Sequence, residues 1–122
     1  MNPVLLIEHA GLVLLGAFFV WGGLNHFRIF RDLRTMLAGR GWPLPGTILV
    51  LASLWEVGWG AVLASGRLTS HAAGALMLFV VLASVSLLDF WNQEGEAREQ
   101  ALSGFMTNVG LLGGLVIAST LA

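Results

Sequence analysis

Four long apolar runs constrain the fold of this chain more than any other feature. They occupy residues 4–24, 46–65, 70–88 and 104–121, and each is close to the length that crosses a bilayer. A hydrocarbon core about 30 Å thick needs roughly 20 helical residues. In lipid only helices and closed barrels satisfy their backbone polar groups, and the alternating polarity of barrel strands is absent. The sequence therefore predicts an all-α fold, a bundle of four transmembrane helices.

The composition indicates an integral membrane protein. Of the 122 residues, 57% are hydrophobic and 11% are charged, which is too apolar for a soluble domain of this size. The net charge of -1 gives no indication of nucleic-acid binding. The lack of cysteine excludes disulfides, thiolate metal sites and a dithiol relay within the chain. We predict a single membrane domain over residues 1–122, with helices over about 4–26, 45–65, 70–90 and 104–121.

The arginines predict how the helices are oriented. Four of the six basic residues lie between residues 28 and 40, and Arg98 follows the third run, whereas the second connection holds only Arg67. By the positive-inside rule, the first and third connections face the cytoplasm and both termini lie outside. Apolar residues recur at helical spacing within residues 29–37, which predicts a short amphipathic helix on the inner membrane surface. The alternative for this connection is a solvated basic loop.

Glu56 is the most informative polar residue, because it lies near the centre of the second run. An acid at the middle of a bilayer costs on the order of 3 kcal/mol on insertion scales, so it should face protein or water. Ser53 and Gly60 lie on the same helical stripe and leave room beside it. The alternative is a protonated acid that only joins two helices by a hydrogen bond. Stripes on the other helices place polar groups at three levels: Glu8 and His71 at the outer level, Glu56 nearly alone in the middle, and His26, Asp89 and Asn108 at the inner level.

Each polar level also has a structural explanation. Glu8 and His71 could simply reach interfacial water, and Asp89 and Asn108 could satisfy backbone groups at helix ends. No closely spaced ligand motif such as HxxxH predicts a metal site. On the last run, small residues at Gly110, Gly114 and Ala118 permit close helix packing, either with a second copy of the chain or with a neighbouring helix.

Several motifs together resemble the DoxX family of membrane proteins over nearly the whole chain. They are GGLNHF, GWPLP, WEVGWGAVLASG, LLDFW and FMTNVGLLGG, in that order. The resemblance implies a four-helix, multi-pass inner-membrane protein of bacteria or archaea, and one branch is similar to the small subunit of thiosulfate:quinone oxidoreductase. The family pattern marks Glu56, Asp89, Phe90, Trp91 and Asn108 in this sequence. His26 stands where the family usually has a basic residue, and Asp89 stands where His is more frequent.

Three functions fit these features. The first is an accessory subunit of a quinone-linked redox system, in which Glu56, His26, Asp89, Trp91 and Asn108 would bind a quinone or similar ligand. No cofactor motif is present, so the electrons would come from a partner subunit, and we assign no catalytic residue. The second is a scaffold in the lipid bilayer that forms a homo-oligomer through Gly110 and Gly114 and recruits partners. The third is a small-solute or proton pathway. We favour the first two together, as a membrane-embedded subunit associated with redox metabolism, and we do not assign catalysis to this chain alone.

Overall fold

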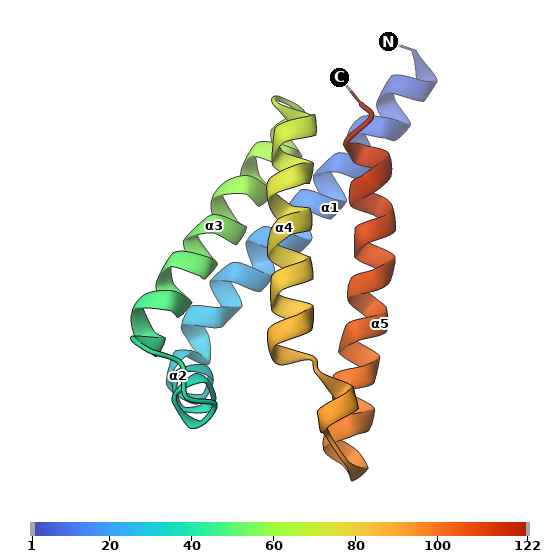
Figure 1. Ribbon diagram of the computed structural model, residues 1–122. Helices are drawn as coiled ribbons and strands as arrows, with labels where there is room; N and C mark the ends of the chain where they lie inside the picture. The colour runs from blue at the N-terminus through green and yellow to red at the C-terminus, as the bar shows by residue number, and fades with distance from the viewer. Residues whose placement is uncertain (1, 122) are drawn as a thin grey trace. The chain divides into compact units, whose positions relative to one another are not determined.

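The structure, a computed structural model, describes residues 2–121, and over this range its regular secondary structure is helical, without strands. Its helices in chain order are α1 (Pro3–Arg28), α2 (Phe30–Gly39), α3 (Pro45–Ser65), α4 (Thr69–Leu87), the short 3-10 helix η1 (Phe90–Asn92) and α5 (Gly95–Ala118) (Figure 1). Four helical segments are long and apolar enough to cross a membrane, and they contain α1, α3, α4 and α5. The predicted fold, four spanning helices with a short helix between the first two, is confirmed.

Two helices differ from their predicted bounds by more than two residues. α5 begins at Gly95, whereas the predicted helix begins at residue 104. The added turns carry Glu96, Arg98 and Glu99, so hydropathy alone cannot detect them. The third span was predicted to reach residue 90, but α4 ends at Leu87 and the chain continues into η1.

Contacts divide the chain into two compact units. Unit 1 comprises the chain up to Arg67 and contains α1, α2 and α3. Unit 2 comprises the chain from Leu68 and contains α4, η1 and α5. Within each unit the two long helices run antiparallel, side by side (Figure 1). The single domain over residues 1–122 stays a prediction.

Small residues set the distance between α1 and α3 in unit 1. A Cβ atom added to Gly16 would collide with the carbonyl oxygen of Gly60 and lie 2.6 Å from the backbone nitrogen of Ala64. Two helical turns further along α1, a Cβ atom added to Gly23 would lie 3.0 Å from the carbonyl oxygen of Ser53. Such close backbone approach is typical of helix packing in membranes. The hydrophobic effect does not drive helices together in lipid, so they associate through van der Waals contacts, which small residues permit at short distance. The contacts fix the register of the two helices.

In unit 2, the buried face of α4 is not the face that carries the predicted stripe of polar residues. The predicted stripe runs from His71 to Asp89, yet His71 is exposed. The buried positions of α4 lie on another face of the helix, and most of them are small residues: Thr69, Ala72, Ala73, Leu76, Val80 and Ser84. Because nearly the whole helix is apolar, hydrophobicity does not mark its packed face, and residue size is the better guide. The side chains that α4 buries therefore do not follow the stripe through His71.

Candidate functional site

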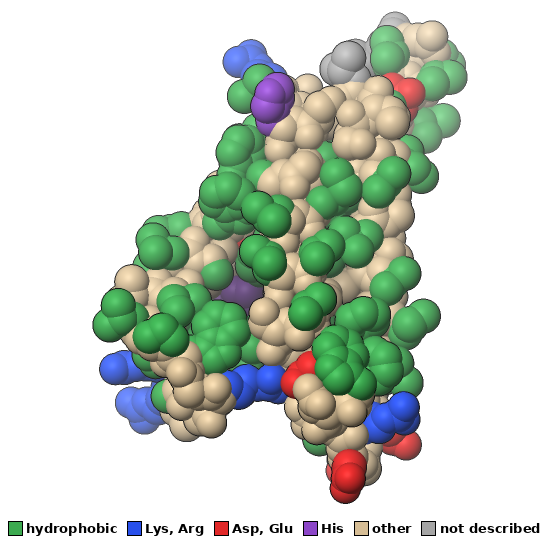
Figure 2. Space-filling view, in the orientation of Figure 1, with side chains coloured by type: hydrophobic (Ala, Val, Ile, Leu, Met, Phe, Trp, Pro, Cys, Tyr) green, Lys and Arg blue, Asp and Glu red, His purple; other side chains and the backbone are tan. Residues whose placement is uncertain are grey.

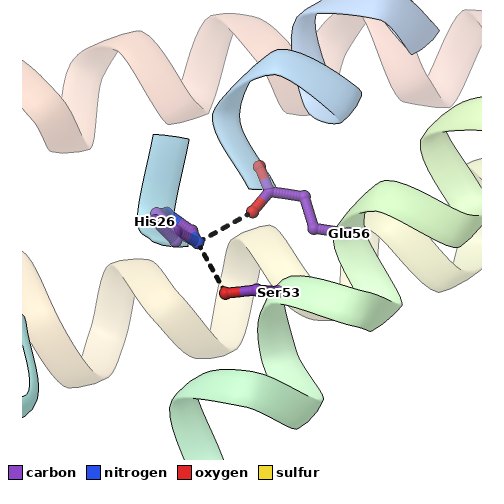
Figure 3. A network of polar contacts seen from close by, with 3 residues as sticks. All are labelled: His26, Ser53 and Glu56. Atoms are coloured by element: carbon purple, nitrogen blue, oxygen red, sulfur yellow. Dashed lines mark hydrogen bonds and ion pairs between the residues drawn. The ribbon is translucent and has the colours of Figure 1, made fainter. Parts of the chain in front are cut away.

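Three polar side chains meet between α1 and α3 in unit 1, and we call them the polar cluster: His26, Ser53 and Glu56 (Figure 3). His26 comes from the last turn of α1, while Ser53 and Glu56 lie three residues apart on one face of α3. The Nδ1 atom of His26 lies 3.1 Å from the hydroxyl oxygen of Ser53 and 3.4 Å from Oε2 of Glu56. The imidazole therefore touches both polar groups of α3.

Glu56 is an acid in the protein interior with one oxygen left unsatisfied. Its side chain is buried, with only 5% of the residue exposed, and Ser53 is fully buried. Within residues 2–121, Oε2 of Glu56 is the buried side-chain polar atom that lacks a hydrogen-bond partner. Leaving such an atom unpaired costs about 1–3 kcal/mol, and more for a charged group. The oxygen can accept a hydrogen bond from a ligand hydroxyl or from water, and this is what the cluster offers chemically.

A pair of glycines on α1 makes room for the carboxyl group. A Cβ atom added to Gly22 would lie 2.9 Å from Oε1 of Glu56, and one added to Gly23 would lie 2.5 Å from Cγ2 of Val57. Gly22 also lies one turn before His26, so both face the carboxyl group from the same side of α1. The sequence signal for this arrangement is the GG pair within an apolar helix.

The position of Glu56 relative to His26 corrects the predicted levels. Glu56 was expected nearly alone in the middle of the membrane, with His26 at the inner level, but the two side chains are in contact. The reason is the helix register: Gly23 lies against Ser53 and Gly22 lies beside the carboxyl group of Glu56, so His26, on the following turn of α1, is close to both side chains. Ser53 was predicted only as a small neighbour, and the structure makes it a hydrogen-bonding partner of the imidazole.

In unit 2, Asp89 and Trp91 make local contacts where α4 leads into α5. Asp89 accepts hydrogen bonds of 3.3 Å from the side-chain amides of Asn92 and Gln93. The ring of Trp91 packs edge-on against Phe105, with 6.0 Å between ring centroids. These contacts order the connection around η1.

Asn108 joins the two long helices of unit 2. Its Nδ2 atom donates a 2.8 Å hydrogen bond to the hydroxyl oxygen of Ser84, which itself donates to the carbonyl oxygen of Val80 at 2.6 Å. Ser84 was not predicted as a partner, because a serine in an apolar helix gives no distinct sequence signal. Ligand binding by Asp89, Trp91 or Asn108 stays a prediction.

We also searched the described residues for a cluster of metal ligands. Within residues 2–121, no group of three or more His, Asp or Glu side chains is close enough to hold a metal ion.

The comparison with protein-family models identifies the family. A family model described as DoxX matches residues 11–89, a range that contains all three members of the polar cluster. Neither the curated proteins nor the solved structures contain a significant match to the chain.

Proposed function

Because the chain belongs to the DoxX family, we propose that it is an inner-membrane accessory subunit of a quinone-linked redox system. It is a multi-pass membrane protein with four helices suited to cross the bilayer. In this proposal the polar cluster binds the head group of a quinone or a similar lipid-soluble molecule. The electrons come from a partner subunit, and this chain is not an enzyme by itself.

The observation that carries the proposal is the buried Oε2 atom of Glu56, which lies 3.4 Å from Nδ1 of His26 but makes no hydrogen bond within residues 2–121. A quinol hydroxyl group supplies the hydrogen-bond donor that this acceptor lacks. Ser53 and His26 can each donate or accept a hydrogen bond, depending on hydroxyl rotation and imidazole tautomer, so they suit a head group that presents carbonyl or hydroxyl oxygens. An apolar setting with a few convergent polar groups is typical of small-molecule sites.

The proposal rests on unit 1. Asp89 and Asn108 are included as ligand-binding residues on the predicted polar levels and the family pattern, and Trp91 on the family pattern. In unit 2, Asp89 and Trp91 make contacts around η1, and Asn108 joins α5 to α4.

The test is a binding titration on the purified full chain with a short-chain quinol under reducing conditions, read by quenching of tryptophan fluorescence. Hydrogen bonds to charged groups contribute about 1.5–3 kcal/mol, so Glu56→Gln should weaken binding roughly tenfold or more. Glu8→Gln is the matched control, because Glu8 is a half-buried carboxyl near the other end of α1. If Glu56→Gln and the wild-type protein bind the quinol equally, the proposed site is wrong.

A scaffold role is the second candidate, and one feature of α5 favours it. Among the described residues, no atom lies within 4 Å of a Cβ atom added to Gly110 or Gly113. α5 is therefore open to close approach at Gly110, and we propose that a second copy pairs with α5 there and at Gly114, one helical turn further along. The test is the oligomeric mass of Gly110→Leu in detergent: a scaffold of this kind requires a smaller assembly than the wild-type protein forms, and an unchanged mass removes the proposal.

A further inference from the structure

The C-terminal part of α1 carries a hollow of about 450 Å³ lined by Trp21, Leu24, Asn25 and Arg28. The spacing of three or four residues places all four side chains on one face of the helix. This face differs from the one packed against α3, which uses Gly16 and Gly23. The volume falls within the range of about 300–1,000 Å³ that is common for small-molecule sites.

The polarity of the hollow changes along the helix in one direction. Trp21 and Leu24 are 64% and 55% exposed, and they offer apolar surface. Asn25 and Arg28 follow, and Arg28 is the last residue of α1. An apolar part followed by an amide and a guanidinium at the helix end matches a phospholipid read from its acyl chains to its phosphate.

Arg28 is held in place with most of its donors available. Its Nε atom donates a 2.8 Å hydrogen bond to the side-chain oxygen of Asn25. Its two terminal nitrogens make no hydrogen bond or ion pair with any residue in the range 2–121. A planar guanidinium whose orientation is fixed in this way presents paired donors to phosphate oxygens.

The charge around the hollow also favours an anion. Arg31 and Arg34 follow on α2 and are exposed, and Asp32 is the single acid between residues 28 and 40. Arginine side chains gather at the end of unit 1 that carries α2 (Figure 2). Basic clusters directly next to a membrane span attract anionic lipids, at about 1 kcal/mol for each Lys or Arg near the surface.

We propose that this hollow binds one anionic phospholipid, with its phosphate on Arg28, its glycerol region at Asn25 and an acyl chain along Trp21 and Leu24. The lipid site contains no residue of the polar cluster, so the lipid proposal can be tested independently of the proposed redox role. The bound lipid would hold the start of α2 at the membrane surface.

The test is native mass spectrometry of the full chain in detergent, titrated with phosphatidylglycerol or with phosphatidylcholine. The wild-type protein should retain phosphatidylglycerol in preference to phosphatidylcholine. Arg28→Gln should weaken phosphatidylglycerol binding roughly fivefold, because one basic group near the surface is lost. It should weaken phosphatidylcholine binding less, because the choline cation of that lipid offsets the attraction of its phosphate to a basic group. Asn25→Ala keeps the charge but frees the guanidinium, so it should give a smaller loss.

Arg67→Gln is the matched control, since Arg67 is an exposed arginine that follows the C-terminal end of α3. Equal binding of phosphatidylglycerol by the wild-type protein, Arg28→Gln and Asn25→Ala would overturn the proposal, as would an equal loss in Arg67→Gln. In a further arm, sodium phosphate is compared with sodium chloride at matched ionic strength. Displacement of the lipid by phosphate alone would assign the hollow to free phosphate and would also overturn the proposal.

Discussion

Replacing Gly16 by alanine should force α1 and α3 apart. The added methyl group would collide with the carbonyl oxygen of Gly60 and would lie 2.7 Å from the Cβ atom of Ala64. Non-bonded carbon atoms prefer a separation of about 3.5–4.0 Å, so the two helices must move by roughly 1 Å. The obstructing atoms belong to a helix backbone or to its Cβ, and none of them can rotate out of the way.

The magnitude follows from two opposing effects. Overpacking a tight interface typically costs about 1–3 kcal/mol, and a rigid obstruction favours the upper part of that range. Alanine also has a higher helix propensity than glycine, by up to about 1 kcal/mol. Gly11→Ala is the matched control, because it lies on the same helix and no described residue lies within 4 Å of its added Cβ. The propensity gain is common to both variants, so their free energies of unfolding should differ by about 2–3 kcal/mol.

The assay is reversible unfolding in mixed micelles with increasing dodecyl sulfate, followed by far-UV circular dichroism. The lack of cysteine in the chain also permits a pair of engineered cysteines on exposed positions, such as Val13→Cys with Ala61→Cys, for spin-label distances. Gly16→Ala should lengthen that distance, and Gly11→Ala should leave it unchanged. Equal stability and equal distance in the two variants would refute the helix register that places Glu56 beside His26.

Three further substitutions test other contacts. Gly22→Ala should displace the carboxyl group of Glu56, because its Oε1 atom would lie 2.9 Å from the new methyl group. This variant should therefore bind the quinol more weakly in the fluorescence titration. Gly58→Ala is the control, since its added Cβ meets no described residue within 4 Å, and it should bind the quinol as the wild-type protein does. Ser84→Ala removes the 2.8 Å hydrogen bond from Asn108, and a double-mutant cycle should give a coupling of about 0.6 kcal/mol in dodecyl sulfate unfolding, the average for such bonds in membrane helices. Gly66→Ala places a side chain at φ 76°, so it should lower the free energy of unfolding by about 1 kcal/mol or more, whereas an effect near zero would argue against the left-handed C-cap of α3.

Much of the fold could be predicted because it depends on hydropathy and charge. The four spans and the amphipathic α2 follow from the apolar runs and from the arginines between residues 28 and 40. The buried stripe of α3 could also be predicted, since Ser53, Glu56 and Gly60 share one face and all three are buried. A single acid in an apolar helix has to be placed on the protected side, which makes this prediction robust.

The contacts between helices could not be predicted in the same way. The pairing of His26 with Glu56 depends on a register that is set by Gly16 and Gly23, and helical periodicity within one helix contains no information about the register of two helices. On α4, nearly all side chains are apolar, so the sequence does not indicate which face is packed. The bond between Ser84 and Asn108 was missed for the same reason.

The most direct test of a ligand site at Glu56 is infrared difference spectroscopy on the purified protein, recorded with and without a short-chain quinol. Isotopic labelling of glutamate carboxyl groups identifies the acid bands. Because Oε2 of Glu56 lacks a hydrogen-bond partner within residues 2–121, a ligand donor should shift one labelled carboxyl band, and that shift should vanish in Glu56→Gln and persist in Glu8→Gln. A spectrum in which the quinol shifts no labelled band, or shifts the same band in Glu56→Gln, would contradict the site.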